Sequence, residues 1–248
     1  MSDFKSRLGL LRSEAIYFWK PFTRRRMRRF YARFVGPDAL VFDVGAHVGS
    51  RSRAFLDLGA RVVAVEPQPA CAAYLRKRWA GESRFTLVAA AVGAQPGRAG
   101  LHVNRLNPTI STLSPARWRA AMAAVARQPE RWDLHLKVEV TTLDRLIDAY
   151  GVPDFCKLDV EGFEAQALAG LTRALPALSF EFVSIDKAAA LVCLERLRVL
   201  GAYRFNWSLR ERLRLESPDW VEAPRVARML AGLGSAVVSG DIYARLGP

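Results

Sequence analysis

Two apolar runs near the start of the chain end in acidic side chains, and a loop of small residues lies between them. Asp43 is the fourth residue of LVFDV, which leads into the loop GAHVG, and Glu66 closes the run VVAVE. In open α/β sheets, ligands bind beyond the carboxyl ends of the strands. Carboxylates at two such ends can accept hydrogen bonds from hydroxyl groups and pair with cations. We therefore expect Asp43 and Glu66 to border one ligand pocket.

The loop after the first run argues against two common classes of ligand. Gly45 permits a tight turn, Ala46 keeps the loop thin, and Gly49 lets the following helix pack closely. A dinucleotide fingerprint has a third glycine between these two, where the backbone touches a pyrophosphate, but His47 holds that position. The lysine-serine pair of a triphosphate-binding loop is missing. The loop therefore predicts an adenosine-containing ligand without phosphate.

S-adenosylmethionine satisfies these constraints. Glu66 is placed to accept both hydroxyls of a ribose, and the segment AAAVG, with Ala91 at its centre, offers an apolar edge for adenine. The ammonium and sulfonium groups of this cofactor are cationic, so a nearby Asp43 is favourable. Simpler roles stay open for both acids: Asp43 could orient the loop by accepting its amide protons, and Glu66 taken alone could be a solvated acid.

A second acidic segment, DFCKLDVEGFE, contains the candidate catalytic groups. Asp159 ends its apolar run and Glu161 follows at the turn, while LSFEFV places Glu181 in an apolar strand, where an unpaired carboxylate is costly. Methyl transfer to an alcohol requires a carboxylate or histidine within about 3 Å to take the hydroxyl proton. Asp159 is the first candidate for this base, with Glu161, Glu181 and His47 in reserve.

Two alternatives remain for these acids. Acidic residues at the start of a helix can cap its amides, a role worth about 1 kcal/mol. Asp159 and Glu181 could also share a divalent ion that acidifies the hydroxyl, since oxygen ligands suit magnesium. No residue is assigned as a metal ligand from the sequence alone.

The composition is that of a globular protein with a strong positive charge. The chain has 248 residues, 51% of them hydrophobic, and a formal net charge of +13. That charge suits nucleic acid, a phospholipid surface or an acidic glycan, and it also suits simple solubility. Three separated cysteines without a CxxC pair indicate a reducing compartment. No apolar run approaches the ~20 residues that span a bilayer, so we expect a cytoplasmic protein.

Residues 1–37 differ from the rest of the chain because aromatic residues and arginines are interleaved there. The segment AIYFWKPFTRRRMRRFYARFV suggests a helix lying on anionic lipid, an arm on a polynucleotide, or a helix that packs its aromatic face on the domain and leaves its arginines in solvent. Pro21 is expected to divide this segment into two helices. We assign residues 1–37 as a basic, aromatic helical leader and residues 38–248 as the main domain.

From residue 39 onward, strand-like and helix-like segments alternate, which is typical of a parallel sheet covered by helices on both faces. Strands are expected at 40–44, 61–66, 85–88, 155–160, 177–183, 203–207 and 240–246, and helices at 48–58, 70–79, 142–150, 163–174, 188–200 and within 220–230. An insertion is expected to hold strand-like segments at 97–104 and 134–140 with a helix at 115–127. Its segment NPTISTLSP either covers the pocket or is a plain polar loop.

Four segments together resemble the FkbM family of S-adenosylmethionine-dependent methyltransferases: VFDVGAHVGS, VVAVEPQP, TTLDRLIDAYGVPDFCKLDVEGFEAQALAGL and LSFEFV. The resemblance covers roughly residues 39–207. It implies an α/β fold with the Rossmann-like class I methyltransferase sheet, mostly parallel with an antiparallel last strand. It also implies an O-methyltransferase that acts on a hydroxyl of a sugar, glycolipid or polyketide-type metabolite.

The resemblance also assigns roles by position. It implies cofactor binding by Asp43, Gly45, Gly49 and Glu66, and an acidic signature formed by Asp159, Glu161 and Gly162. His47 stands where asparagine is common, and the leader lies outside the resemblance, so neither inherits a role.

Two other functions stay in competition with this one. The charge and the basic leader suit an RNA methyltransferase, but the fourth strand ends in LDVEG and not in the Asn/Asp-Pro-Pro-aromatic tetrad that grips a base nitrogen. The chain could also be a non-catalytic, membrane-peripheral module that retains the fold. We expect a small-molecule or glycan acceptor, no nucleic acid, and an anionic inner membrane face as a second candidate partner of the leader.

Overall fold

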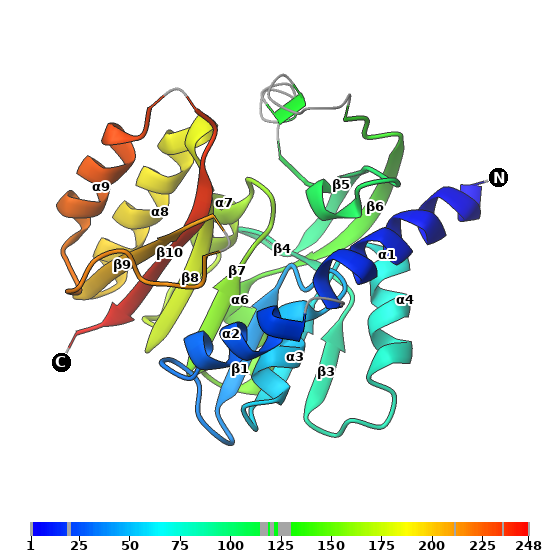
Figure 1. Cartoon of the computed structure of the whole chain (residues 1–248), viewed down its shortest axis with the longest axis horizontal. Helices are drawn as coiled ribbons and strands as arrows, with labels where there is room; N and C mark the ends of the chain where they lie inside the picture. The colour runs from blue at the N-terminus through cyan, green and yellow to red at the C-terminus, as the bar shows by residue number, and fades with distance from the viewer. Residues whose placement is uncertain are drawn as a thin grey trace.

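A seven-stranded sheet runs through the centre of the molecule (Figure 1). The computed structural model describes residues 2–18, 21–114, 119, 122–123, 130–210, 212–234 and 236–247. In spatial order the strands are β3 (Phe85–Val88), β2 (Arg61–Val65), β1 (Leu40–Val44), β7 (Phe155–Leu158), β8 (Ala177–Val183), β10 (Ser239–Leu246) and β9 (Tyr203–Leu209). Strand β10 runs antiparallel to both of its neighbours, and the other pairs are parallel. The Rossmann-like class I methyltransferase sheet expected from the sequence is confirmed.

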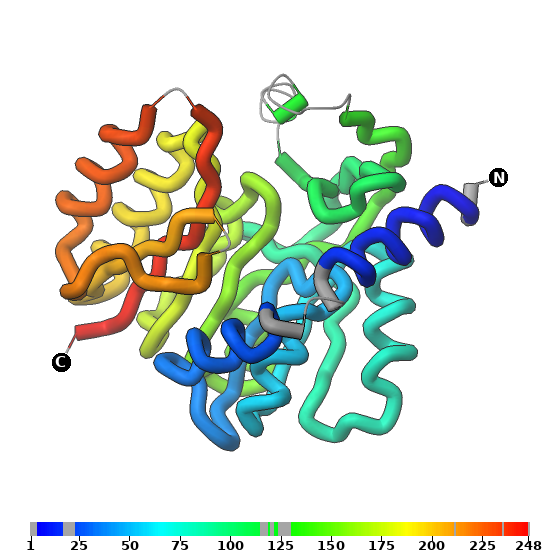
Figure 2. The backbone as a smooth tube through the Cα atoms, viewed as in Figure 1, coloured from blue at the N-terminus to red at the C-terminus, as the bar shows by residue number. Residues whose placement is uncertain are grey.

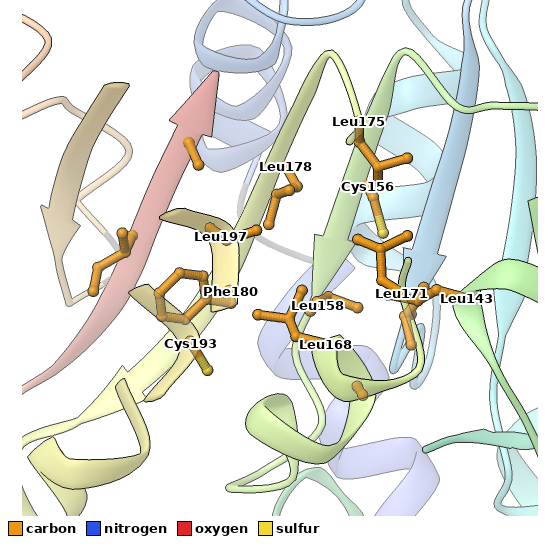
Figure 3. Packing of buried hydrophobic residues seen from close by; sticks show 14 of the residues in the cluster. Leu143, Cys156, Leu158, Leu168, Leu171, Leu175, Leu178, Phe180, Cys193 and Leu197 are labelled. Carbon is orange, nitrogen blue, oxygen red and sulfur yellow. The ribbon is translucent and has the colours of Figure 1, made fainter. Parts of the chain in front are cut away.

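Helices cover both faces of this sheet, which explains why its central strands are apolar on both sides. All five residues of β1 are buried. Phe42 and Val44 belong to the cluster that faces α6 (Leu143–Tyr150), α7 (Glu164–Ala169), α8 (Lys187–Leu200) and α9 (Ala223–Gly232), and part of this cluster is shown in Figure 3. Val41 faces the other cluster, which includes residues of α2 (Pro21–Tyr31), α3 (Ser50–Leu56) and α4 (Pro69–Arg78). The apolar residues of β1 therefore alternate between the two cores.

The insertion forms a second, three-stranded sheet beside the first. Its order is β4 (Ala91–Val92), β6 (Leu134–Thr141) and β5 (Gly97–Val103), with β5 and β6 antiparallel, and the two longer strands lie where the sequence predicted strand-like segments. A short 3-10 turn, η1 (Pro108–Ile110), follows β5, and a second one, η2 (Ser184–Asp186), precedes α8. Most of the predicted helix at 115–127 lies outside the described residues.

Three elements are shorter than the sequence predicted by two or more residues. The strand expected at 155–160 ends at Leu158, before Glu161 with its φ of +54°. Helix α3 begins at Ser50 rather than at 48, because Gly49 before it has a left-handed φ of +78°. Helix α7 stops at Ala169 and is followed by Gly170, where a Cβ atom would lie 2.3 Å from the Gly93 carbonyl oxygen, so the close approach of the two segments requires glycine.

The leader forms two helices, α1 (Ser2–Phe18) and α2, and α2 begins at Pro21 as predicted. Figure 2 shows the two helices following one another along the same side of the molecule. Met27, Phe30 and Tyr31 of α2 are buried, and the ring of Tyr31 packs edge-on against Phe55 of α3 at 4.8 Å between centroids. Helix α2 therefore packs its aromatic face on the domain, as the third alternative for the leader predicted. None of the described helices has the length and apolar character needed to cross a bilayer.

Candidate functional site

The loops that follow β1 and β7 touch each other at Gly45. The backbone N–H of Gly45 donates to the Val65 carbonyl oxygen at 2.9 Å, which holds the first loop beside the end of β2. A Cβ atom at position 45 would lie 1.8 Å from the Asp159 carbonyl oxygen, so no side chain has room there. Its φ of +82° also lies in the left-handed region that favours glycine. The two acidic loops predicted to share a pocket therefore meet at the carboxyl edge of the sheet.

The rest of the first loop is shaped by His47 and Gly49. His47 has a φ of +52°, which is uncommon for a side-chain-bearing residue, and burial lowers the pKa of its imidazole to about 4. It is therefore neutral at physiological pH. At Gly49 a Cβ atom would lie 2.4 Å from Cη2 of Trp79, so this glycine makes room for the residue that follows α4.

Glu66 joins this loop to the segment that follows β2 through its carboxylate. The side chain is only 2% exposed, and its Oε2 and Oε1 atoms accept the backbone N–H groups of His47 at 2.7 Å and Gln68 at 2.8 Å. Burial raises the pKa of Glu66 to about 7, although these two hydrogen bonds oppose the shift. Each carboxylate oxygen has a second lone pair that can accept from another donor. Glu66 is therefore a buried acceptor fixed at the end of β2.

An apolar pocket of about 490 Å³ opens beside Glu66. Its walls include Glu66, His47, Val65, Ala91, Leu101 and Phe163. Its carboxylates are those of Glu66, Asp159 and Glu161, and mostly apolar walls with a few polar groups are the usual lining of a small-molecule or cofactor site. Two sheets contribute to it, because Ala91 and Leu101 belong to the strands of the insertion.

A second pocket, of about 440 Å³, adjoins the first and is charged. The two share Gly45, His47, Thr109, Asp159 and Glu161 as lining residues. The charged pocket is also lined by Asp43, Ala46, Ser50, Arg51 and Lys157. The shared residues make the two pockets neighbouring parts of one cleft, apolar at one end and ionic at the other.

Lys157 is the buried cation of this cleft. Its side chain is 1% exposed, and its Nζ atom lies 2.6 Å from Asp159 Oδ2 and 3.7 Å from Asp241 Oδ1. Burial alone would lower the pKa of Lys157, but the two carboxylates outweigh it and the pKa is raised. For Asp159, burial acts to raise the pKa, and the Lys157 ammonium holds it below the ordinary value. The two side chains therefore form a charged pair.

Glu161 and Glu181 complete a cluster with Asp159. One carboxylate oxygen from each of the three lies within 4.8 Å of the others. Burial, and then the charge of Asp159, raises the pKa of Glu161 and of Glu181 well above the ordinary carboxylate value. Glu161 lines both the apolar and the charged pocket, whereas Glu181 lines a third, smaller pocket beside Glu164. Of the three acids, Asp159 carries the charge and the two glutamates hold protons more readily.

The insertion loop holds Glu161 in place. The hydroxyls of Thr112 and Ser114 both donate to the Glu161 carbonyl oxygen, at 2.6 and 3.0 Å. Glu161 has a φ of +54°, a left-handed conformation that must be supported by its surroundings. The neighbouring Thr109 and Ser111 line the apolar pocket. The segment NPTISTLSP is therefore a wall of the pocket and a support for an acidic residue.

The structure gathers most of the predicted site residues, and two lie behind the pockets. Asp43, Gly45, Ala46, His47, Glu66, Ala91, Asp159 and Glu161 line one or both pockets. Gly49 packs against Trp79, and Glu181 faces the third pocket. Asp43 also accepts a hydrogen bond from Ser52 Oγ at 2.5 Å, so it orients the start of α3 as well.

Lys157 and Arg51 are pocket residues that the sequence interpretation missed. A signal existed for Lys157, because it interrupts the buried run FCKL two residues before Asp159, and alternate strand residues share a face. A lysine in that position predicts a buried ion pair. Arg51 gave no such signal, since an arginine at the start of a helix after a small-residue loop is ordinary.

Residues 43–189 match the model of the Methyltransferase FkbM domain. The chain belongs to the FkbM methyltransferase family. It therefore contains the FkbM methyltransferase domain that the sequence predicted, the domain of a family that uses S-adenosylmethionine.

Among curated proteins, the chain is similar to the 2-O-methyltransferase NoeI of Sinorhizobium fredii, with 29% identity over 147 residues. The match covers 54% of this chain and 58% of that protein, so the chain spans little more than half of the relative's length.

Among solved structures, the chain is similar to the precorrin-6y C5,15-methyltransferase of Geobacter metallireducens, with 15% identity, a TM-score of 0.48, and coverage of 90% of this chain and 86% of that one. It is also similar to a TehB-like SAM-dependent methyltransferase of Corynebacterium glutamicum, with 13% identity, a TM-score of 0.43, and coverage of 89% and 87%. TM-scores below 0.5 indicate nothing about the acceptor.

Proposed function

We propose that this methyltransferase transfers the methyl group of S-adenosylmethionine to a hydroxyl group of a sugar-containing or polyketide-type small molecule. The observation that carries the proposal is the position of Glu66, a buried carboxylate between the glycine loop and the apolar walls of the pocket. The name of the relative NoeI, a 2-O-methyltransferase, supports an oxygen atom as the acceptor.

The residues of the cleft match the parts of S-adenosylmethionine in chemical character and in their order along the cleft. Glu66 would accept the two ribose hydroxyls, and the apolar walls with Ala91 and Phe163 would hold the adenine. In the charged pocket, Asp43 and Asp159 would face the amino-acid end, where the cofactor carries positive charge. When bound, the cofactor supplies a methyl group that is already electrophilic.

Arg51 and Lys157 balance the acids of the charged pocket. Lys157 neutralises Asp159 in the pair described above, and Arg51 lines the same pocket near the start of α3. We assign Arg51 to the carboxylate of the cofactor's amino-acid end, because a guanidinium binds a carboxylate through two parallel hydrogen bonds. The pocket would then offer carboxylates to the ammonium group of the cofactor's amino-acid end and a guanidinium to its carboxylate.

Glu161 is our choice for the base that removes the hydroxyl proton. The sequence favoured Asp159, but the Lys157 ammonium at 2.6 Å lowers the pKa of Asp159 and weakens it as a proton acceptor. Glu161 lines both pockets, and its raised pKa makes its carboxylate a stronger base once it is ionised. His47, with a pKa of about 4, is a weaker acceptor than either glutamate of the cluster.

The RNA alternative is less favourable on electrostatic grounds. The charged pocket is lined by three acidic residues, Asp43, Asp159 and Glu161, and by two basic ones, Arg51 and Lys157, so it offers a phosphodiester no excess of positive charge. The basic residues concentrate in the leader instead, where residues 1–37 hold ten basic and two acidic side chains. A neutral or cationic acceptor suits the cleft better.

Isothermal titration with S-adenosylmethionine tests the cofactor site, using the wild-type chain, Glu66→Ala and a surface control, Glu139→Ala. Glu139 is exposed on β6 and lines neither described pocket. We expect wild type and Glu139→Ala to bind equally, and Glu66→Ala to bind at least about tenfold more weakly as two hydroxyls lose their acceptor. NAD serves as a negative ligand. Unchanged affinity of Glu66→Ala, or binding of NAD, would refute the assignment.

Methyl transfer is then measured with methyl-labelled S-adenosylmethionine and a panel of glycans, lipid-linked sugars, polyketides and transfer RNA. A label that resists base hydrolysis, which cleaves methyl esters, and that mass spectrometry locates on oxygen and not on nitrogen identifies an alkylated hydroxyl. Label on RNA alone would overturn the proposed acceptor class while leaving the cofactor site intact.

A further inference from the structure

Helix α1 contacts the domain through small and polar residues. Gly9 and Ser13 are buried, and a Cβ atom at position 9 would lie 2.1 Å from the Arg105 carbonyl oxygen. On the same side, Glu14 accepts a hydrogen bond from the Tyr74 hydroxyl of α4 at 3.0 Å. Positions 9 and 13 are one turn apart, so they lie on one face of the helix. This face is the attached side of α1.

The opposite face of α1 is apolar and exposed. Phe4, Leu8 and Leu11 are 71%, 48% and 63% exposed. Their spacing of four and three residues places them in one stripe, on the side away from Gly9 and Ser13. A helix that packs on a globular domain ordinarily turns such a stripe toward the core. In α1 the orientation is reversed, and the stripe has no covering element among the described residues.

Helix α2, the next element of the leader, exposes arginines on the face away from its buried residues. Arg25, Arg28 and Arg29 are exposed, and within the described part of the chain none of them makes an ion pair or a side-chain hydrogen bond. Arg24 differs, because it donates two hydrogen bonds to Asp57 at 2.7 Å. The three arginines therefore have their charges available for an external partner.

The apolar stripe and the arginines belong to consecutive helices. Figures 1 and 2 show α1 and α2 following one another along the same side of the molecule. Residues 1–37 hold ten basic and two acidic side chains, a net charge of +8 out of +13 for the whole chain. Apolar side chains next to unpaired cations match the two layers of an anionic membrane surface, which are acyl chains and phosphate headgroups.

We propose that Phe4, Leu8 and Leu11 of α1, together with Arg25, Arg28 and Arg29 of α2, dock the protein on an anionic lipid bilayer. The stripe enters the boundary between headgroups and acyl chains, and the arginines contact lipid phosphates. A second copy of the chain fits this surface less well, because it would bring two arginine clusters of the same sign together.

Docking would also place the cleft near the bilayer. The attached side of α1 rests on the segment from Arg105 to Pro108, and the carbonyl oxygen of Pro108 accepts a hydrogen bond from Gln68 at 3.0 Å. Gln68 lines the apolar pocket beside Glu66. One short segment therefore joins the docking surface to the cofactor site.

Vesicle flotation of the full chain tests this proposal. The vesicles contain either phosphatidylcholine alone or phosphatidylcholine mixed with phosphatidylglycerol. Three variants are compared with wild type: Phe4→Ser/Leu8→Ser/Leu11→Ser, Arg25→Gln/Arg28→Gln/Arg29→Gln, and the control Arg61→Gln/Arg225→Gln/Arg228→Gln. The control removes three exposed arginines from β2 and α9, so it changes the net charge equally but leaves the leader intact.

We expect wild type and the control to float with the anionic vesicles only, and both leader variants to lose at least about tenfold in partitioning. Flotation that falls equally in the control would show a net-charge effect and overturn the proposal. A wild-type dimer in light scattering that becomes monomeric in the serine variant would assign the stripe to a second copy instead. Each variant is also titrated with S-adenosylmethionine, so a failure of the cofactor site is recognised separately from a failure to dock.

Discussion

The Lys157 ammonium lies 2.6 Å from Asp159 Oδ2, and the lysine side chain is almost completely buried. Lys157 sits beside Asp43 in the register of β1 and β7, and Asp241 contributes a second carboxylate at 3.7 Å. A lone buried ammonium is very costly, so the pair is stable only because each charge compensates the other. The centre of the cleft is therefore an ion pair in which replacing either residue alone leaves the other charge uncompensated.

The first prediction concerns the stability of this pair. Replacing Lys157 by methionine leaves Asp159 and Asp241 without their cation, and we expect the free energy of unfolding to fall by about 3 kcal/mol at pH 8. Urea denaturation of Lys157→Met and of the double variant Lys157→Met/Asp159→Asn measures it. The double variant should recover part of the loss, because it removes one of the uncompensated charges. Equal losses in both variants would show that the lysine acts through packing alone.

The second prediction concerns divalent metals. The sequence alternative had Asp159 and Glu181 share an ion, and in the structure the carboxylates of these two residues and of Glu161 lie close enough to do so. The Lys157 ammonium, however, already neutralises Asp159, and a second cation beside it would be repelled. We expect methyl transfer to persist after treatment with EDTA and to be unchanged by added magnesium. Loss of activity with EDTA and its recovery with magnesium would restore the metal alternative.

Much of this site follows from sequence patterns, and the reason is geometric. In a parallel sheet the strand ends are neighbours, so Asp43, Glu66 and Asp159 had to meet once their strands were recognised. The family resemblance then fixed the order of the sheet. The start of α3 was missed, because it depends on the left-handed conformation of Gly49. That residue packs against Trp79, which lies far from it in the sequence.

The contributions of the insertion were harder to foresee. Thr112 reaches the carbonyl oxygen of Glu161 across 49 residues of sequence, and no local pattern encodes that distance.

The reversed orientation of α1 was also hidden, because a stripe of Phe4, Leu8 and Leu11 normally predicts the buried side of a helix. Which side is attached depends on Gly9 and on the loop that it touches.

The third prediction concerns the base. Because its pKa is raised, Glu161 gains a proton at a higher pH than an ordinary carboxyl, and only its ionised form accepts the hydroxyl proton. Turnover should therefore rise with pH through a range above that of ordinary carboxylates. We expect Glu161→Gln to lose about 10² to 10⁴ in kcat, to lose this pH dependence, and to keep its affinity for S-adenosylmethionine. An unchanged pH profile in Glu161→Gln would transfer the role to another group.

The fourth prediction concerns Glu66 and the pH dependence of stability without cofactor. Its pKa is about 7 in the folded chain against an ordinary value of 4.5, so the folded state binds the proton more tightly than the unfolded state. Stability is then lost as pH rises from 4.5 through 7 and is constant above that range. Glu66→Gln does not titrate, so between pH 4.5 and 8 its stability relative to wild type should improve by about 3 kcal/mol. Urea denaturation at both pH values measures the change, and a constant difference would contradict the raised pKa.

The last prediction concerns the contact between the two acidic loops. Gly45→Ala would force a methyl group to within 1.8 Å of the Asp159 carbonyl oxygen and would place a side chain at a φ of +82°, which costs about 1–2 kcal/mol by itself. The loops must then separate, so affinity for S-adenosylmethionine should fall at least about tenfold. Gly100→Ala is the matched control, because a Cβ atom there meets nothing within 4 Å and the backbone has no positive φ. If both variants titrate like wild type, the cofactor site does not depend on this close approach, and the loop glycine is required only for the turn.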